Sequence, residues 1–330
     1  MSESPAVDAV LQPAGPVAAV IAEMSWVLII GAAIVFCIVM VALLGALLEA
    51  RHERGEQLGD QPDERRAAEG RAVTRWWIIG AGFIFPVSVL SALLAYSAWR
   101  TSALTPPRDA GEPVISVTGH LWWWEVRYRD PARGLDVVLA NEIHLPVGRA
   151  VTLGLTSADV IHSFWVPALA GKVDMLPGRV HQLRLQADRT GVFRGQCAEF
   201  CGEQHARMAL HVVAHEPADF ERWLQAQARP AQPPRDALAQ RGAQVFAEQR
   251  CGACHSVRGL GPSASIIGPD LTHVGSRLHL AAGTLPMGEA TLRHWLTDPQ
   301  RSKPGARMPS YQRLDDASLA ALAAFLLQLR

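Results

Sequence analysis

The sequence predicts three structural parts in order: a two-helix transmembrane hairpin, an all-β barrel or sandwich, and an all-α domain at the C-terminus. Three observations lead to this prediction. Two uncharged apolar stretches lie near the N-terminus, runs of Val, Ile, Leu and Trp broken by Gly and Pro follow them, and helical periodicity dominates the last part. A chain of 330 residues is long enough for two domains of about 100–200 residues each in addition to membrane segments.

Two apolar stretches are expected to cross a membrane. The stretch 24–48 contains 25 residues without a charge, and 76–99 contains 24 more. Both exceed the about 20 residues that a helix needs to span a hydrocarbon core, and a buried core helix fits uncharged runs of this length poorly. A secretory signal fits neither stretch, because residues 1–23 carry no Lys or Arg and the apolar runs are too long.

The charges that flank these stretches predict the orientation. The loop 49–75 carries six arginines, whereas the tail 1–23 has no basic residue. Positive charge in short loops stays on the cytoplasmic side, so we expect the hairpin to turn inside the cell and both termini to lie outside. Everything after about Arg100 is then extracytoplasmic. The aromatic residues at the expected membrane interfaces are Trp76, Trp77, Tyr96 and Trp99.

The region 112–216 is expected to form one all-β domain. No helix of ordinary length fits between its strand-like runs, which favours a sandwich or a small Greek-key barrel. A linker rich in Pro is expected at 217–235. The clearest strand-like runs are 114–118, 122–128, 151–156, 179–186 and 209–214.

The last region, 236–330, is expected to be helical with long loops. Helical character is visible at 236–250 and 291–297. Near the C-terminus four leucines fall on one helix face, and three candidate N-cap residues precede them. The leucines are Leu319, Leu322, Leu326 and Leu329, and the candidate caps are Asp315, Asp316 and Ser318.

Charge and cysteine content narrow the function. The 31 basic and 31 acidic residues balance, which gives no reason to expect nucleic acid as a partner. Cys37 stands alone in an apolar run, and the other four cysteines form two close pairs, Cys197 with Cys201 and Cys251 with Cys254. Close pairs outside the cytoplasm can be disulfides, so the surroundings of each pair decide its role.

The first cysteine pair belongs to a group of soft metal ligands. Two thiols, an imidazole and a thioether occur within twelve residues, and a second histidine lies 35 residues before the first cysteine. Soft sulfur with imidazole suits copper, and two cysteines spaced to face one point suggest two coppers bridged by both thiolates. The candidate ligands are His162, Cys197, Cys201, His205 and Met208.

Two alternatives explain fewer of these residues. A disulfide between Cys197 and Cys201 leaves both histidines and Met208 without a role. Structural zinc takes cysteine and histidine, but it has no use for the thioether and prefers other loop spacings. Two coppers share one electron between them, so bond lengths and solvent rearrange little when it moves. Such a site suits electron transfer and not hydrolysis.

From the hairpin to the cysteine loop, the chain resembles subunit II of the haem–copper cytochrome c oxidases. The resemblance rests on the segment 119–124 (Gly-His-Leu-Trp-Trp-Trp), the segment 172–179 (Lys-Val-Asp-Met-Leu-Pro-Gly-Arg), the surroundings of His162 and the cysteine loop itself. It implies a cupredoxin-like barrel that holds the dinuclear copper centre CuA. It also implies a bacterial inner membrane location, with the metal domains on the periplasmic side.

The same resemblance implies a role for each residue of the copper site. Both cysteines bridge the two coppers, one histidine binds each copper, and two weak ligands complete the site. The bridging cysteines are Cys197 and Cys201, and the histidines are His162 and His205. The weak ligands are Met208 and the backbone carbonyl of Glu199. The Glu199 side chain would help to bind a magnesium ion at the contact with subunit I. Trp122 would accept electrons from cytochrome c; strand alternation places Trp122 and Trp124 on one face and leaves their roles open.

The second cysteine pair lies in the motif Cys251-Gly-Ala-Cys254-His255, which is the signature of covalently attached haem c. On a helix these three residues share one face, so both thiols can reach the haem vinyl groups while His255 ligates the iron. A redox dithiol is the alternative, but no βαβ pattern surrounds the motif. With the segment 268–271 and the helical C-terminus, the motif resembles class I cytochromes c, in which Pro269 lies against the proximal histidine.

The second axial ligand of the iron is expected to be a methionine, which raises the reduction potential. Met308 stands in a Met-Pro loop before the last helix, whereas Met287 precedes a helix start and is interpreted as a core residue. We therefore expect His255 and Met308 as the axial ligands. The remaining histidines of this domain, interpreted as surface or core residues, are His273, His279 and His294.

These features predict a membrane-anchored electron-transfer protein with two metal centres. The resemblance implies a subunit II that passes electrons from haem c through CuA to subunit I, where oxygen is reduced to water and protons are pumped. Expected partners are subunits I and III, the lipid bilayer, and cytochrome c or another upstream donor. A subunit of another terminal reductase, such as a nitric oxide reductase, is the alternative. A copper-delivery protein is disfavoured by six ligands and a covalent haem.

Overall fold

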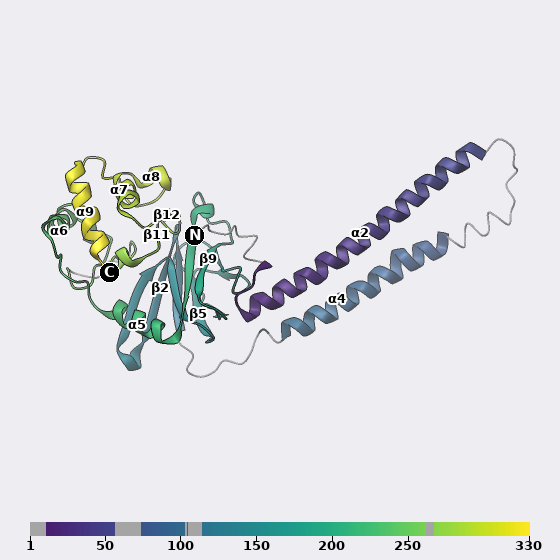
Figure 1. Cartoon of the computed structure of the whole chain (residues 1–330), viewed down its shortest axis with the longest axis horizontal. Helices are drawn as coiled ribbons and strands as arrows, with labels where there is room; N and C mark the ends of the chain where they lie inside the picture. The colour runs from purple at the N-terminus through teal and green to yellow at the C-terminus, as the bar shows by residue number, and fades with distance from the viewer. Residues whose placement is uncertain (1–10, 57–73, 103, 105–113, 262–266) are drawn as a thin grey trace. The chain divides into compact units, whose positions relative to one another are not determined.

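The computed structural model describes residues 11–56, 74–102, 104, 114–261 and 267–330. These residues form two compact units. One unit contains the two long helices, and the other contains the N-terminal residues up to Ala19 together with everything from Asp109 onward. Figure 1 shows the elements along the chain.

The two long helices match the predicted hairpin. They are α2 (Pro16–Glu56) and a second helix composed of a π-helical segment, η1 (Trp77–Ile84), and α4 (Phe85–Ser102). Both are long and apolar enough to cross a membrane, and they run in opposite directions in Figure 1. Because α2 begins at Pro16, the last part of the predicted tail 1–23 is helical. Proline suits a first helical position, and the alanines after it continue the helix beyond the apolar run.

An ion pair joins the two helices at one end. The hydroxyl of Tyr96 donates a hydrogen bond of 2.9 Å to the carboxylate of Glu23, and Arg100 pairs with the same carboxylate. Glu23 directly precedes the first apolar stretch and Arg100 directly follows the second. An antiparallel hairpin brings these two positions to the same end, which explains why the three side chains meet.

The β-domain is a sandwich of two five-stranded sheets, as predicted. One sheet has the order β3-β2-β1-β5-β8 and the other has the order β4-β10-β9-β6-β7. Apolar side chains from both sheets, among them Trp124 and Phe164, fill a common core. The strands are β1 (Val114–His120), β2 (Trp123–Asp130), β3 (Leu135–Ala140), β4 (Glu142–Pro146), β5 (Val151–Ser157), β6 (His162–Trp165), β7 (Val173–Met175), β8 (His181–Leu185), β9 (Gly191–Cys197) and β10 (Ala209–His215).

Part of the predicted linker 217–235 is helical. Its first twelve residues form α5 (Pro217–Ala228), which packs against β3, β4 and β10. The Trp223 ring stacks on the His144 imidazole with centroids 3.9 Å apart, and Leu224 is buried. The segment is therefore an amphipathic helix that covers the sandwich, and the irregular connection is limited to 229–236.

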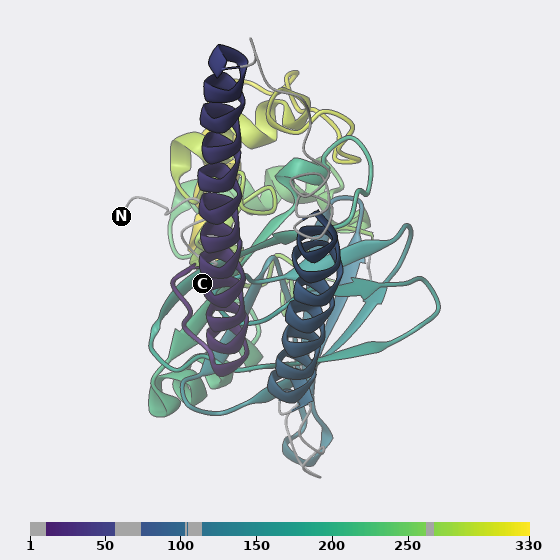
Figure 2. The ribbon, with the colours of Figure 1, turned by 90° about the vertical axis from the view of Figure 1, so that its right-hand side faces the viewer.

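The C-terminal part is a second domain with its own core. Its helices are α6 (Ala237–Glu248), α7 (Glu289–Thr297), α8 (Pro299–Ser302) and α9 (Asp316–Gln328). Asp315 caps α9 by accepting a 2.8 Å hydrogen bond from the Ser318 amide, so the first of the three candidate caps fills that position. A short ribbon of β11 (His279–Leu280) and β12 (Leu285–Pro286) adds strands to a domain predicted to be all-α. This domain lies beside the sandwich in both views (Figures 1 and 2).

Candidate metal centres

The predicted copper ligands converge at one end of the second sheet. Strand β6 begins at His162 and the neighbouring strand β9 ends at Cys197, with Phe164 paired to Cys197 across the ladder. A loop containing a single 3₁₀ turn, η3 (His205–Arg207), then returns the chain into β10. Two ligands are thus held by strands, and three, Cys201, His205 and Met208, come from the loop between β9 and β10.

The five side chains face one another at metal-site distances. The two Sγ atoms are 3.8 Å apart, far from the about 2.05 Å of a disulfide, and both thiols are free. Each thiol faces a different histidine: Cys197 Sγ is 3.8 Å from His162 Nδ1, and Cys201 Sγ is 3.7 Å from His205 Nδ1. Met208 Sδ is 3.8 Å from Cys201 Sγ. This symmetry fits two ions between two shared thiolates better than one ion.

Burial and charge prepare the thiols for metal. Cys197, Cys201 and Met208 are buried and His162 is fully buried, so water has little access to the ligand atoms. Cys201 and His162 lower the pKa of the Cys197 thiol by hydrogen bonding, and Cys197 in turn raises the pKa of Cys201. The free pair therefore shares one proton, which metal binding must release.

Asp159 orients the first histidine. Its carboxylate accepts a 2.8 Å hydrogen bond from His162 Nε2, so Nδ1 is the nitrogen that faces Cys197 and that would bind metal once its own hydrogen bond to the thiolate is given up. Its second oxygen accepts a 2.8 Å hydrogen bond from the backbone amide of Leu121. Asp159 is not among the predicted site residues, although an acid three residues before a candidate metal histidine is a signal that can be read from the sequence.

Glu199 takes part through its backbone. Its carbonyl oxygen lies 3.2 Å from Cys197 Sγ, where the resemblance expects a weak ligand. The Glu199 side chain is exposed, and among the described residues the group of three or more converging His, Cys, Asp and Glu atoms is His162, Cys197 and Cys201, without Glu199. This part of the chain therefore adds no further ligand for the expected magnesium ion.

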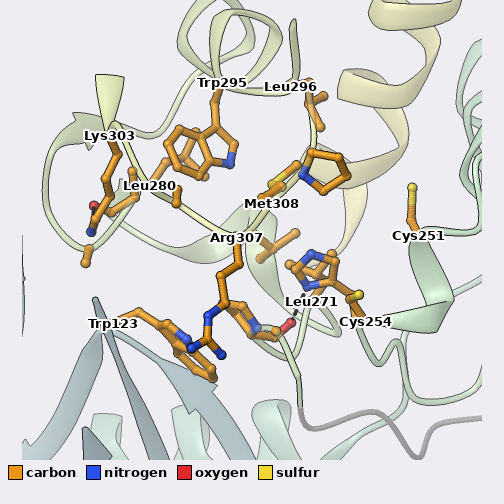
Figure 3. A pocket seen from close by; sticks show the side chains of 18 of the residues that line it. Trp123, Cys251, Cys254, Leu271, Leu280, Trp295, Leu296, Lys303, Arg307 and Met308 are labelled. Carbon is orange, nitrogen blue, oxygen red and sulfur yellow. Dashed lines mark hydrogen bonds between the residues drawn. The ribbon is translucent and has the colours of Figure 1, made fainter. Parts of the chain in front are cut away.

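The second site is a cavity of about 350 Å³, lined mostly by the C-terminal domain and on one side by residues 120–123 of the β-domain. Cys251, Cys254, His255 and Met308 all line it, so the attachment motif and the expected axial methionine open into one space. Cys254 and Met308 approach this space from different segments in Figure 3. Apolar side chains complete the wall and suit a large flat ligand: Phe246, Leu271, Trp295, Leu296, Leu322 and Leu326.

A hydrogen bond at Nδ1 holds the His255 ring and leaves Nε2 available as a metal ligand. Its Nδ1 lies 2.8 Å from the carbonyl oxygen of Pro269, which can only accept, so Nδ1 carries the proton and Nε2 keeps a lone pair for iron. Gly268 makes room for the ring, because a Cβ there would stand 2.8 Å from His255 Cε1. The predicted contact of Pro269 with this histidine is therefore present. Met287 packs against the domain core and does not line the cavity.

Trp122 lies between the two sites. Strand β2 begins at Trp123, and the β1–β2 ladder closes with the pair His120 and Trp123, so Leu121 and Trp122 form the two-residue turn. The prediction that Trp122 shares a strand face with Trp124 is therefore wrong. Its indole Nε1 instead donates a 2.8 Å hydrogen bond to the carbonyl of Cys201, and the residue lines the cavity of the C-terminal domain.

Comparison with known proteins agrees with both sites. The family model for the periplasmic domain of cytochrome c oxidase subunit II matches residues 114–215, and the cytochrome c model matches 239–330. Cytochrome c oxidase subunit 2 of Alkalihalophilus pseudofirmus is 33% identical over 97% of this chain and 90% of that protein. Its counterpart from Bacillus sp. strain PS3 is 30% identical over 77% of this chain and 73% of that protein.

One similar solved structure is the periplasmic domain of subunit II of the Bradyrhizobium japonicum cytochrome oxidase. The match covers 36% of this chain and 95% of that domain. The two are 30% identical, with a TM-score of 0.34. The copper-type ligand loop, the haem-type cavity and the matches along nearly the whole chain agree with one another. The chain therefore belongs to the cytochrome c oxidase subunit II family and carries a cytochrome c domain at its C-terminus.

Proposed function

We propose that this chain receives electrons for a haem–copper oxidase, passing them from haem c through CuA to subunit I, where oxygen is reduced to water and protons are pumped. One observation carries the proposal: the haem-type cavity and the copper loop share a wall. Trp122 lines the cavity, and its indole is hydrogen-bonded to the backbone of Cys201. An electron leaving the cavity on this side therefore meets the backbone of a copper-bridging residue.

The convergence of these side chains supports an assignment of the residues that would hold the two groups. Both thiolates would bridge the copper pair and both imidazoles would bind it, with the thioether and one carbonyl as weak ligands. The second site would attach haem through two thioethers and hold its iron between imidazole and thioether. The copper ligands would be Cys197, Cys201, His162, His205, Met208 and the Glu199 carbonyl; Cys251 and Cys254 would attach the haem, and His255 and Met308 would ligate its iron. When bound, both groups supply one-electron transfer.

The chain itself contributes orientation and shielding. Asp159 and Pro269 each hold one histidine by the nitrogen that faces away from the site. Burial of most copper ligands and the largely apolar lining of the haem cavity limit solvent rearrangement when charge moves. We further propose subunit III and cytochrome c or another soluble donor as partners, with the metal domains periplasmic and both termini outside. A magnesium ion at Glu199 would need its other ligands from subunit I.

The acceptor is tested with the purified complex that contains this chain. We expect the complex, with its haem c reduced beforehand, to consume oxygen and to reoxidise haem c in the same turnover. Consumption of nitric oxide with no consumption of oxygen would assign the chain to a different terminal reductase and reject the oxidase proposal.

Replacing Asp159 by asparagine is expected to weaken copper binding by about 10- to 100-fold, the usual effect of losing the partner that orients a metal-binding histidine. The amide removes the negative charge beside His162 and cannot accept from both His162 and the Leu121 amide, as the carboxylate does. Copper affinity is measured by chelator competition on the full chain. The matched control is Asp188→Asn, an exposed aspartate of the same domain. Equal affinities in the two variants would contradict the orienting role.

A further inference from the structure

The cytochrome c domain is attached to the copper domain by a set of direct contacts as well as by the connecting chain. The Ala209 amide donates a 3.0 Å hydrogen bond to the Ala282 carbonyl, and the Leu278 amide donates to the carboxylate of Glu142. Arg207 donates a 2.7 Å hydrogen bond to the Ser302 carbonyl. Segments 278–282 and 302–305 of the cytochrome domain therefore lie directly on the copper loop and on β4 and β10.

Lys303 is the most buried charged group of this contact. The residue is only 4% exposed. Its Nζ donates to three backbone carbonyls, those of Trp122 at 2.7 Å, Arg207 at 2.9 Å and Ala281 at 3.1 Å. An ammonium has three donors, and these three acceptors use all of them. Two of the acceptors belong to the copper domain and one belongs to the cytochrome domain, so a single group bonds both.

The choice of lysine at this position is unusual for this chain. The sequence contains 29 arginines and two lysines, Lys172 and Lys303. A planar guanidinium presents its donors in a fork, whereas a compact ammonium can converge on three carbonyls in a small buried space. Burial lowers the pKa of Lys303 to about 7, with Cys201 opposing this shift and the Arg207 charge adding to it. The three carbonyl oxygens around Nζ can only accept hydrogen bonds, which favours the charged ammonium. The geometry therefore requires this residue type.

We propose that Lys303 is a positioning residue that holds the cytochrome c domain against the copper loop, with the haem cavity at Trp122. This role rests on the electron path proposed above. The ammonium binds the Trp122 carbonyl directly, and Lys303 also lines the haem cavity (Figure 3). Displacing the ammonium would free the Trp122 turn and the Arg207 turn from the same anchor, and these turns border the indole that separates the two sites.

The docked position also covers Trp122. Gly305 approaches the indole so closely that a Cβ on Gly305 would stand 3.4 Å from Cη2 of the ring. A protein donor from solution would find this face occupied by the chain's own 303–305 segment. Because this segment leaves Trp122 only partly exposed, such a donor would deliver electrons to the cytochrome domain, and Trp122 would serve the internal donor.

Lys303→Met tests the proposal in the intact complex. The methionine cannot make the three hydrogen bonds of the charged ammonium. Their loss should lower the ratio of docked to undocked cytochrome domain by about 10- to 100-fold. Amide exchange, measured by mass spectrometry, should accelerate by at least about 10-fold in peptides covering 203–211 and 278–286. Electron transfer from flash-reduced haem c to copper should slow by a similar factor. Thermal unfolding of the haem domain, followed by haem absorbance, should stay cooperative, with a Tm lowered by no more than the lost docking contributes.

Two further variants make the result specific. Arg301→Met removes a positive charge from α8, directly before Lys303, but Arg301 is exposed, and this variant should leave exchange and electron transfer unchanged. Lys303→Gln retains donors without the charge and should fall between wild type and Lys303→Met, and it replaces the methionine variant if that variant fails to incorporate haem. Unchanged exchange in the lysine variants would overturn the docking role. Faster exchange with an unchanged transfer rate would support docking and reject the electron path.

Discussion

Replacing Cys197 by serine is expected to abolish the mixed-valence copper signal and to leave haem c in place. A serine hydroxyl does not ionise in the accessible pH range and is a hard ligand, so it cannot bridge two coppers as a soft thiolate does. Cys197 Sγ also faces His162, the Glu199 carbonyl and Cys201, so its loss removes the centre of the ligand set. Electron paramagnetic resonance on the full-length protein reports the copper pair, and visible absorbance reports haem c.

Oxygen consumption by the Cys197→Ser complex should fall by more than about 100-fold, because loss of an orienting partner alone costs about 10- to 100-fold at metal sites. Cys37→Ser is the matched control, since Cys37 is an exposed thiol in α2 far along the chain from both sites. It should retain the copper signal and full activity. A mixed-valence signal that survives in the Cys197→Ser protein would show that these thiolates do not hold copper.

The parts of the fold that can be predicted from the sequence are those whose hydrophobic pattern lies within one continuous segment. The two apolar stretches and the leucine stripe of α9 can be read from the chain because each burial pattern is complete within one segment. Strands β6 and β7 are short, and β4 is buried along its whole length although it contains Glu142 and His144. Alternation is therefore weak there, and pairing with distant partners defines these strands.

Helix α5 has a helical pattern of apolar residues in its sequence, but the prolines that follow it led to the prediction of a linker. Phe220, Trp223, Leu224 and Gln227 recur at helical spacing, and their side chains pack toward the sandwich. The prolines at 230, 233 and 234 led to a linker assignment for the whole segment, whereas proline affects only its own surroundings. The helix ends at Ala228, before the first of them.

For the sites, ligand identities follow from residue type and spacing, whereas the supporting contacts do not. Cys251, Cys254 and His255 occupy one short turn, so the motif contains its own geometry. The three carbonyls around Lys303 come from positions up to 181 residues away in the sequence. Trp122 was assigned to a strand because alternation says nothing about where a hairpin turns. Every residue type has the same backbone carbonyl, so residue types do not reveal which carbonyls will bind a side chain.

Gly242→Ala is expected to destabilise the cytochrome domain strongly. Alanine is the better helix former by about 1 kcal/mol, so the local effect inside α6 is favourable. The tertiary effect opposes it, because a Cβ on Gly242 would stand 2.0 Å from the Ala321 carbonyl oxygen and 2.7 Å from Phe325 Cβ. The overlap is with backbone of α9, which cannot rotate away as a flexible side chain can. The two helices must therefore move apart.

That separation affects the haem cavity. Phe246 on α6 packs against Phe325 on α9 with ring centroids 5.6 Å apart, and Phe246, Leu322 and Leu326 line the cavity wall. Overpacking of this kind costs about 3 kcal/mol or more, which for a domain of this size lowers Tm by about 12 °C or more. Thermal unfolding of the full-length protein, followed by haem absorbance, measures the change.

Gly288→Ala provides the control for Gly242→Ala. A Cβ on Gly288 would meet Thr291 Oγ1 at an ordinary 3.5 Å, and its φ of 175° is extended backbone that any residue adopts. Its effect should stay within about 1 kcal/mol, the usual range for a change at a helix N-cap. If Gly242→Ala were as stable as Gly288→Ala, the close crossing of α6 and α9 would not be what holds the cavity closed. The gain in helix propensity would then exceed the cost of separating the helices.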